Sequence, residues 1–341
     1  CLIVSAIFIA PMYDMPIYVL AWGVLLAGIL QLLIQISPLL SINRLPVPKL
    51  DTKNPGLRRF FKLILPAILA GGIIQINLLI DTIFASLLET GSPTWLYVSD
   101  RLIQFPMGIF AIAIGTVLLP TLSNIDLEKE KNNFIKNIKK GQRFVLFVGI
   151  PSLIGLFFCA EDLISTIFYR GEFTELDVFK SSYSLMAFSI GLPFFMLMKV
   201  LTPAFFARKD TKTPMYVAFI SLILNAFFNY LLAFVFGFGH VGLAIGSSIA
   251  ALISVLILET ILYKQGFIKI TNIFNRFNFM ILISSLFLIA FLSFYTTKTN
   301  FIEFNQIERL FYLSIEILAS IFIYFFIARI INGKSLRTLF N

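Results

Sequence analysis

Apolar residues dominate this chain in runs of about twenty, separated by short polar segments. A membrane-spanning helix needs roughly 20 apolar residues, and a helix satisfies its own backbone hydrogen bonds in lipid. The runs do not alternate as barrel strands would, so the pattern predicts an all-α polytopic membrane protein. The predicted spans are residues 1–10 (part of one span), 16–39, 60–88, 94–119, 143–160, 181–204, 214–236, 241–262, 278–296 and 310–330.

Composition supports the same class. Hydrophobic residues make up 58% of the 341 positions, charged residues 13%, and the mean hydropathy is +0.91; soluble domains carry about 25% charged residues. The chain begins at Cys1 inside an apolar run, so we expect a fragment that lacks N-terminal residues of a longer protein. Two cysteines, Cys1 and Cys159, and one histidine, His240, predict no metal cluster, disulfide framework or cofactor. We expect His240, within GFGHVG, to be a polar residue of a short loop.

The basic residues predict the orientation. Twenty-one of the 27 lysines and arginines fall in alternate polar segments, at 44–62, 129–143, 208–212, 264–276 and 329–337. Four fall in the opposite set: Arg170, Lys180, Lys298 and Arg309. Because lysine and arginine are enriched in cytoplasmic loops, the C-terminus is predicted to be cytoplasmic. The net charge of +9 follows from this topology, and we expect no nucleic-acid partner.

The polar segment at 121–143 has a helical pattern of its own. Phe134, Ile135 and Ile138 share one face, and most lysines of the segment lie on the other. This favours an amphipathic helix attracted to anionic lipids at the membrane surface. A solvated basic loop explains the pattern equally well.

Arg101 lies inside a predicted span, where a charged side chain costs roughly 2.5–3.5 kcal/mol on insertion scales. Other polar or small residues recur with it at intervals of three and four: Thr94, Tyr97, Gln104 and Gly108. They form one stripe along a helix, and the planar guanidinium group suits phosphate oxygens. The stripe therefore predicts an anion site. The alternative is a structural ion pair, for which Asp81 on the preceding span is a better partner than the adjacent Asp100.

Further polar residues lie in other spans. Asn77 and Asp81 are one helical turn apart, as are Asn225 and Asn229. These oxygen-rich side chains suit a small cation, although interhelical hydrogen bonding is the commoner explanation. Lys199, near the inner end of its span, can extend toward the cytoplasm or meet an anionic headgroup. No nucleotide-binding motif or catalytic grouping is evident, so neither an ATP-driven pump nor an enzyme is predicted.

Five segments carry a family resemblance: QINLLIDTIFAS (75–86), WLYVSDRLIQFPMGIFAIAIGTVLLPTLS (95–123), FYRGEFT (168–174), LMKVLTPAFFARKDTKTP (197–214) and GHVGLAIGSSIAA (239–251). In them the chain resembles the lipid II flippase family (MurJ/MviN) of the multidrug/oligosaccharidyl-lipid/polysaccharide exporter superfamily. The resemblance implies that residues 1–40 end a first lobe and 41–59 form a cytoplasmic linker. Residues 60–262 would form a second six-helix lobe, and 263–341 two C-terminal helices that make a groove for a lipid tail.

The resemblance also implies a function. Members flip lipid II, an undecaprenyl-pyrophosphate-linked saccharide-peptide used in peptidoglycan biosynthesis, from the cytoplasmic to the periplasmic leaflet of the bacterial inner membrane by alternating access. Arg101 matches an arginine of the family's cationic cavity, and Thr94 and Gln104 match other cavity positions, where Gln104 replaces a frequent glutamate. With Tyr97 and Lys199 they are the expected substrate-binding residues.

The resemblance bears on coupling as well. Asp81 and Asn225 fit the pattern of relatives that hold sodium, whereas Asn229 stands where a relative has a carboxylate. Sodium, a proton or the membrane potential would then drive transport, with bilayer lipids as the other partners. Alternatives to lipid II export are export of another polyprenyl-linked saccharide or of drugs, a polyprenyl-phosphate enzyme, and a scaffold without transport.

Overall fold

The computed structural model describes residues 2–13, 15–41, 55–268, 275–296 and 301–340. Most of these residues are helical and none of them lies in a strand, which confirms the predicted all-α class. The chain divides into two units, Cys1–Phe60 and Phe61–Asn341. Most of the expected linker at 41–59 lies outside the described residues, because 42–54 are not among them.

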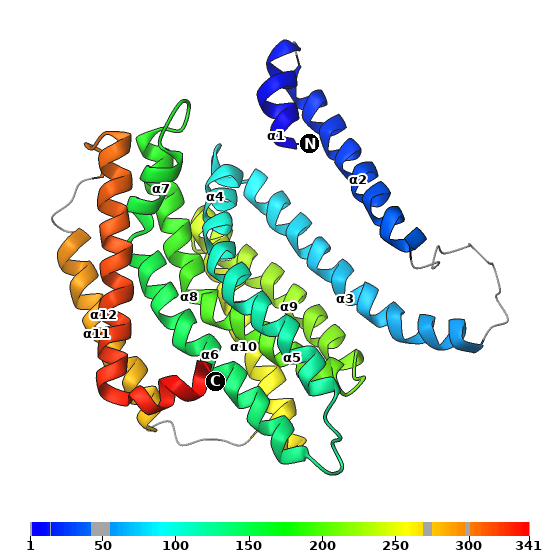
Figure 1. The fold of residues 1–341 in the computed structure, drawn as a ribbon. Coiled ribbons are helices and arrows are strands. Elements are labelled where there is room, and N and C mark those ends of the chain that lie inside the picture. The colour runs from blue at the N-terminus through cyan, green and yellow to red at the C-terminus, as the bar shows by residue number, and fades with distance from the viewer. Residues whose placement is uncertain (1, 14, 42–54, 269–274, 297–300, 341) are drawn as a thin grey trace. The chain divides into compact units, whose positions relative to one another are not determined.

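The first unit is built from a short irregular helical segment and one long helix (Figure 1). The segment consists of α1 (Leu2–Val4), the π-helical turn η1 (Ser5–Ile9) and the 3₁₀ turn η2 (Ala10–Met12), and α2 (Pro16–Ser41) follows. Gly23 allows the close contact between the two parts, because a Cβ there would lie 2.7 Å from the Ser5 Oγ. The helix α3 (Pro55–Ser86) begins in this unit and continues into the second.

The second unit contains the remaining helices. In chain order they are α4 (Ser92–Pro106), η3 (Met107–Ile112), α5 (Ala113–Ser123), α6 (Lys131–Phe158), α7 (Ala160–Phe168), α8 (Glu175–Phe206), α9 (Lys212–Tyr230), η4 (Leu231–Val235), α10 (Gly239–Lys264), α11 (Arg276–Thr296) and α12 (Gln306–Phe340). Eight segments are long and apolar enough to cross a membrane: Tyr18–Ser41, Ser92–Ser123, Lys131–Phe158, Glu175–Phe206, Lys212–Val235, Gly239–Lys264, Arg276–Thr296 and Gln306–Gly333. The chain is thus a multi-pass membrane protein, and α3 coincides with the further span expected at 60–88.

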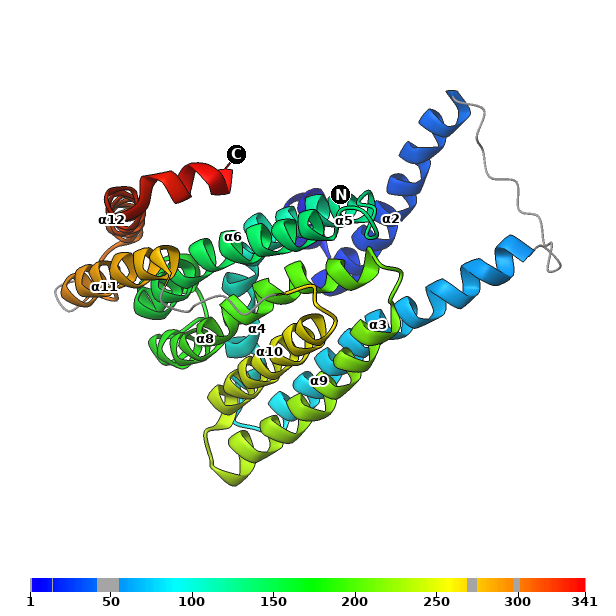
Figure 2. The same ribbon diagram turned by 90° about the horizontal axis from the view of Figure 1, so that it is seen from below.

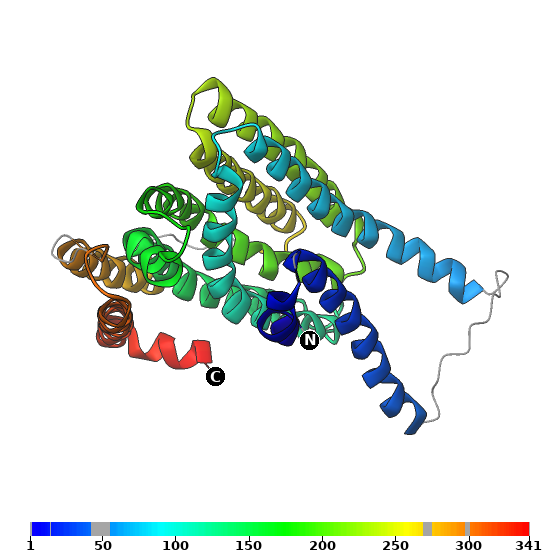
Figure 3. The same cartoon turned by 90° about the horizontal axis from the view of Figure 1, so that it is seen from above.

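The helix α8 is the centre of this unit. It packs against α4, α6 and α10, and α10 packs in turn against α9 (Figures 2 and 3). The core at these contacts is apolar and includes Leu192, Met196 and Leu201 of α8, all fully buried. On the other side, α11 and α12 pack against each other and against α6 (Figure 1).

The segment at 121–143 differs from both expectations. The helix α5 ends at Ser123, and α6 begins at Lys131 and runs without interruption into the next span. Phe134 and Ile138 are fully buried in the protein core, with the Phe134 ring 5.4 Å from that of Phe267. Both readings, a surface-bound helix and a solvated loop, were wrong. An amphipathic pattern indicates that one helix face is apolar, but lipid and protein can both cover such a face.

The span Ser92–Ser123 is not a uniform α-helix. A single π-helical turn, η3, follows Pro106 and separates α4 from α5. Beyond this turn, α5 comes close to α8 at Gly115, where a Cβ would lie 3.0 Å from the Lys199 carbonyl oxygen. Such π-helical turns are rare and are often found at functional sites.

Candidate functional site

The helix α4 is anchored to α8 by one buried face. Gly91 precedes it with φ +104°, and a Cβ there would lie 2.6 Å from the Trp95 ring. The Trp95 Nε1–H donates to the Asp177 Oδ1 at 2.6 Å, and the Ser99 hydroxyl donates to the Ser181 carbonyl oxygen at 2.7 Å. Because Trp95 and Ser99 are buried, the opposite face of α4 is fixed in orientation.

His240 belongs to this anchor rather than to a loop. It lies in the first turn of α10 and is buried, with its Nε2 3.0 Å from the Lys180 carbonyl oxygen. Its ring is 4.8 Å from the Trp95 ring. The expectation of a loop position was therefore wrong, and the contacts give His240 a structural role.

The exposed face of α4 carries the predicted polar stripe. Thr94, Tyr97, Arg101 and Gln104 are all exposed within the chain. The Arg101 guanidinium lies over the Tyr97 ring, 4.6 Å from its centroid, and its Nη1 donates to the Gln104 Oε1 at 3.3 Å. The Gln104 Nε2 donates to the Asp100 carboxylate. The structure thus brings Tyr97, Arg101 and Gln104 into contact and leaves the guanidinium accessible.

Asp81 is not the partner of Arg101. Among the described residues no carboxylate lies within ion-pair distance of Arg101. The Asp81 carboxylate instead accepts hydrogen bonds from the Asn229 Nδ2 at 2.6 Å and the Asn77 Nδ2 at 3.1 Å. The proposed ion pair was wrong because matching depths from two span ends do not determine which helix faces point at each other.

The second predicted set forms one hydrogen-bonded network across α3, α9 and α10. The Asn229 Nδ2 also donates to the Asn225 Oδ1 at 2.9 Å, and the Asn225 Nδ2 donates to the Ser247 hydroxyl at 2.9 Å. Asn225 and Asn229 are buried. Gly246 makes room for the network, because a Cβ there would lie 2.2 Å from the Asn229 Oδ1. This network contains interhelical hydrogen bonds, which are one of the two roles that the sequence predicted for these polar residues.

The network also has oxygen atoms to spare. The Asn77 Oδ1 and the Asn229 Oδ1 are buried without a hydrogen-bond partner. With Asp81 they make a group of hard oxygen donors carrying at most one negative charge, a set that fits a monovalent cation better than a divalent one. Asp100 lies near enough to Asp81 for their charges to interact, so the network and the stripe are electrostatically linked.

Lys199 is exposed on α8, but away from Arg101. Its backbone faces Gly115, which lies fourteen residues beyond Arg101 on the same span. At 1.5 Å of rise per residue this is roughly 21 Å along the helix axis. A single compact ligand group cannot contact both side chains.

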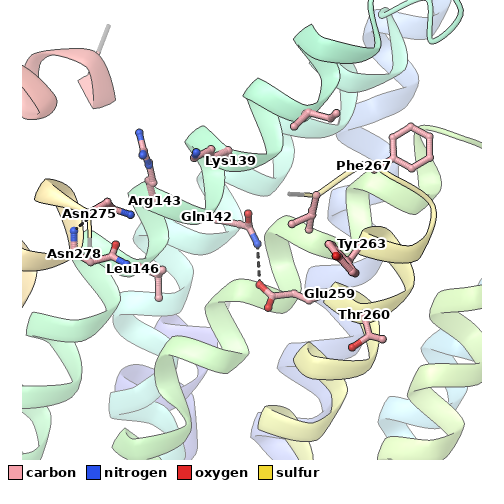
Figure 4. A pocket seen from close by; sticks show the side chains of 12 residues that line it. Lys139, Gln142, Arg143, Leu146, Glu259, Thr260, Tyr263, Phe267, Asn275 and Asn278 are labelled. Carbon is pink, nitrogen blue, oxygen red and sulfur yellow. Dashed lines mark hydrogen bonds between the residues drawn. The ribbon is translucent and has the colours of Figure 1, made fainter. Parts of the chain in front are cut away.

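Two cavities lie elsewhere in this unit. One, of about 460 Å³, is bordered by α6, α10 and the start of α11 (Figure 4). Lys139 and Arg143 line it, and the Gln142 Nε2 donates to the Glu259 Oε1 at 2.8 Å. The other, of about 430 Å³, lies between the η3–α5 segment and α6. Neither includes a residue of the polar stripe or of the hydrogen-bonded network.

Comparison with known proteins agrees with this architecture. The family model described as lipid II flippase MurJ matches residues 1–331. A probable lipid II flippase MurJ of Vibrio cholerae is 41% identical over 271 residues, which are 80% of this chain and 51% of that protein. The lipid II flippase MurJ of Burkholderia cenocepacia is 34% identical over 268 residues, 77% of this chain and 52% of that protein. The chain belongs to the MurJ family, as its sequence resemblance indicated, and spans about half the length of the curated relatives it matches.

Solved structures are similar as well. A lipid II flippase MurJ in an inward closed conformation matches with a TM-score of 0.68 and 27% identity, over 86% of this chain and 59% of that one. A transporter of the multidrug/oligosaccharidyl-lipid/polysaccharide exporter superfamily from Pyrococcus furiosus matches with a TM-score of 0.50 and 17% identity, over 79% of this chain and 62% of that one. The second likeness concerns the fold alone, and it agrees with the exporter-like bundle that was expected.

Proposed function

We propose that this protein moves lipid II from the cytoplasmic to the periplasmic leaflet of a bacterial inner membrane. Membership of the MurJ family supports this proposal, as do the eight apolar helices. The substrate would be the undecaprenyl-pyrophosphate-linked saccharide-peptide lipid, whose anionic headgroup must cross the apolar layer while its tail stays in lipid. The protein would act as a transporter, with no chemical change to the substrate.

The observation that carries the proposal is the accessible guanidinium of Arg101. It stands in a membrane-spanning helix, and no carboxylate among the described residues lies within ion-pair distance of it, although the charge of the adjacent Asp100 interacts with it. Its contacts, the Tyr97 ring and the Gln104 amide, orient the group without cancelling its charge. A pyrophosphate can accept paired N–H bonds from the planar fork of arginine. In this proposal Thr94 and Lys199 also meet the substrate, Lys199 at a position well separated from Arg101.

The units of the chain would then have distinct roles. Residues 60–262 would form the second lobe, residues 263–341 would line a groove for the lipid tail, and residues 1–40 would end the first lobe. The lobes would alternate between inward and outward access, with the C-terminus in the cytoplasm. The membrane potential supplies about 2.3 kcal/mol per charge per 100 mV, and would help return a cationic cavity after release of the anion.

The network around Asp81 would supply a second driving force. We propose that its unpartnered amide oxygens and the Asp81 carboxylate bind a sodium ion. Asn77, Asn225 and Asn229 would hold the ion or its carboxylate in place. Since α3, α9 and α10 meet at this network, occupancy would favour one packing of these helices.

Complementation tests the assignment. The complete gene carrying Arg101→Ala should fail to support growth after depletion of the native lipid II flippase, whereas Lys136→Ala, an exposed basic residue of α6, should support it. Loss of a charged hydrogen-bonded contact costs about 1.5–3 kcal/mol, or roughly 10–150-fold in headgroup affinity. Arg101→Lys keeps the positive charge but lacks the planar guanidinium, so growth of this strain should lie between that of the wild type and that of Arg101→Ala. Lipid II should accumulate in the inner leaflet of the Arg101→Ala strain.

Two outcomes would refute the assignment. Normal growth on Arg101→Ala alone would remove the arginine from the transport path. Failure of the unmodified gene, with the protein present in the membrane, would favour export of another polyprenyl-linked saccharide or of drugs.

A further inference from the structure

A buried pair of carboxyl groups joins α7 to α12, outside the polar stripe and the Asp81 network. Asp162 of α7 is 6% exposed and Glu316 of α12 is 0% exposed. The two carboxyl groups are within hydrogen-bonding reach of each other. Apart from the Cys159 thiol, which lies within hydrogen-bonding reach of Glu316, no donor among the described residues reaches the Asp162 Oδ2 or either oxygen of Glu316. Two facing acceptors can form a hydrogen bond only if one of them carries a proton.

No nearby positive charge neutralises the pair. The closest candidate on α12 is Arg309, but its guanidinium is occupied by backbone carbonyls, donating to the Phe301 oxygen at 2.7 Å, the Ile302 oxygen at 2.9 Å and the Ser165 oxygen at 3.4 Å. The described ion pairs involve neither carboxyl group. A buried carboxylate without a partner is strongly unfavourable, and such groups take up a proton instead.

The other titratable groups around the pair make a second negative charge still less favourable. They are the Cys159 thiol at the start of α7, Glu161 of α7, and Tyr295 of α11. Each is neutral or negative, so none of them offsets a second negative charge on the pair. Burial, followed by the neighbouring Glu316 carboxyl, raises the pKa of Asp162, whose helix lies outside the eight candidate spans.

A bound metal ion is a poorer explanation than a proton. Among the described residues, no group of three or more histidine, cysteine, aspartate or glutamate side chains has the geometry to hold one. The hydroxyl of Thr166, one helical turn from Asp162 on α7, is buried and unpartnered.

We propose that Asp162 and Glu316 form a proton-binding site in which the two carboxyl groups share one proton, and that this proton holds α12 against α7. When the proton leaves, two negative charges face each other in an apolar contact. The contact between the C-terminal helix pair and the helices before it then loosens. Proton occupancy thereby becomes a control on how α12 packs, independent of the binding of substrate at Arg101.

The sign of the pH effect follows from which state binds the proton more tightly. The folded state keeps a proton that the unfolded chain releases near pH 4, the ordinary carboxyl range. Stability from the pair is therefore complete at acid pH and is lost as pH rises through the folded-state pKa. Between about pH 4 and the folded-state pKa of the pair, the unfolding equilibrium constant rises about tenfold per pH unit.

The test compares the purified full-length protein with an isosteric variant, Asp162→Asn with Glu316→Gln, in which amides replace the acids. Wild-type unfolding should become easier as pH rises, and the double variant should lose this slope. The matched control is Glu308→Gln, an exposed glutamate on the same helix, which should keep the wild-type slope. Equal slopes in wild type and double variant would overturn the proposal.

A second measurement stands even if the double variant fails to fold. Infrared spectra of wild-type protein with isotope-labelled glutamate and aspartate carboxyls should show a protonated carboxyl at neutral pH that disappears in alkali. Absence of that band at neutral pH would overturn the proposal. So would a sodium-dependent rise of the unfolding midpoint that the single variant Glu316→Gln removes, because it would identify a metal cation in place of the proton.

Discussion

Gly246→Ala tests the role of the Asp81 network as the contact that fixes α9 against α10. The added Cβ would lie 2.2 Å from the Asn229 Oδ1, 3.0 Å from the Asn229 backbone nitrogen and 3.2 Å from the Phe228 carbonyl carbon. The last two atoms are backbone, so rotation of the Asn229 side chain cannot relieve the clash. The two helices must separate, and the interhelical bonds from Asn225 to Ser247 and from Asn229 to Asp81 must lengthen or break.

The expected magnitude combines three effects. Overpacking in a tight contact costs about 1–3 kcal/mol. Two interhelical hydrogen bonds in a membrane protein contribute about 0.6 kcal/mol each. Replacing glycine by alanine inside a helix returns about 1 kcal/mol. The net destabilisation of Gly246→Ala is therefore about 1–3 kcal/mol.

The assay is reversible unfolding in detergent micelles, followed by helical circular dichroism. Gly155→Ala is the matched control, because Gly155 is also helical and a Cβ there meets nothing within 4 Å. That variant should be about 1 kcal/mol more stable than wild type. If Gly246→Ala were as stable as Gly155→Ala, the close contact between Gly246 and Asn229 would not exist in the folded protein.

Two further predictions concern other contacts of the site. Trp95→Phe removes the 2.6 Å bond to Asp177 and should lower the free energy of unfolding by about 1.5–3 kcal/mol. The control is Trp22→Phe, at a position 69% exposed, which should change that free energy by less than about 0.5 kcal/mol. Equal effects of the two substitutions would refute the anchoring of α4 by Trp95. Sodium chloride should raise the unfolding midpoint above that in matched choline chloride, and Asp81→Asn should abolish the difference; a sodium effect that survives in Asp81→Asn would place the ion elsewhere.

Hydropathy was sufficient to predict the spanning helices. Lipid imposes length and apolarity on every span, and both are readable in one dimension. The polar stripe on α4 was predictable for the same reason, since Tyr97, Arg101 and Gln104 follow the helical repeat and do come together. Intervals within a helix determine which side chains share a face.

Contacts between helices were harder to predict from the sequence. The pairing of Asp81 with Asn229 instead of Arg101 depends on helix rotation, which no interval within one helix encodes. Phe134 was misread because an apolar stripe packs equally well on lipid and on protein. Glu316 was overlooked although it is the one acidic residue of the span at 310–330; an acid in an apolar run is itself a signal for a buried partner.

The π-helical turn η3 changes which side chains share a face along the span Ser92–Ser123. A π-helical turn takes up about one extra residue, and each residue of an α-helix corresponds to a rotation of about 100°. Residues after Ile112 are therefore out of phase with those before Pro106. Because of this turn, the first half of the span exposes a cationic face at Arg101. The second half packs closely against α8 at Gly115. A deletion of one residue in η3 would bring the two faces back into phase and leave neither suited to its neighbours.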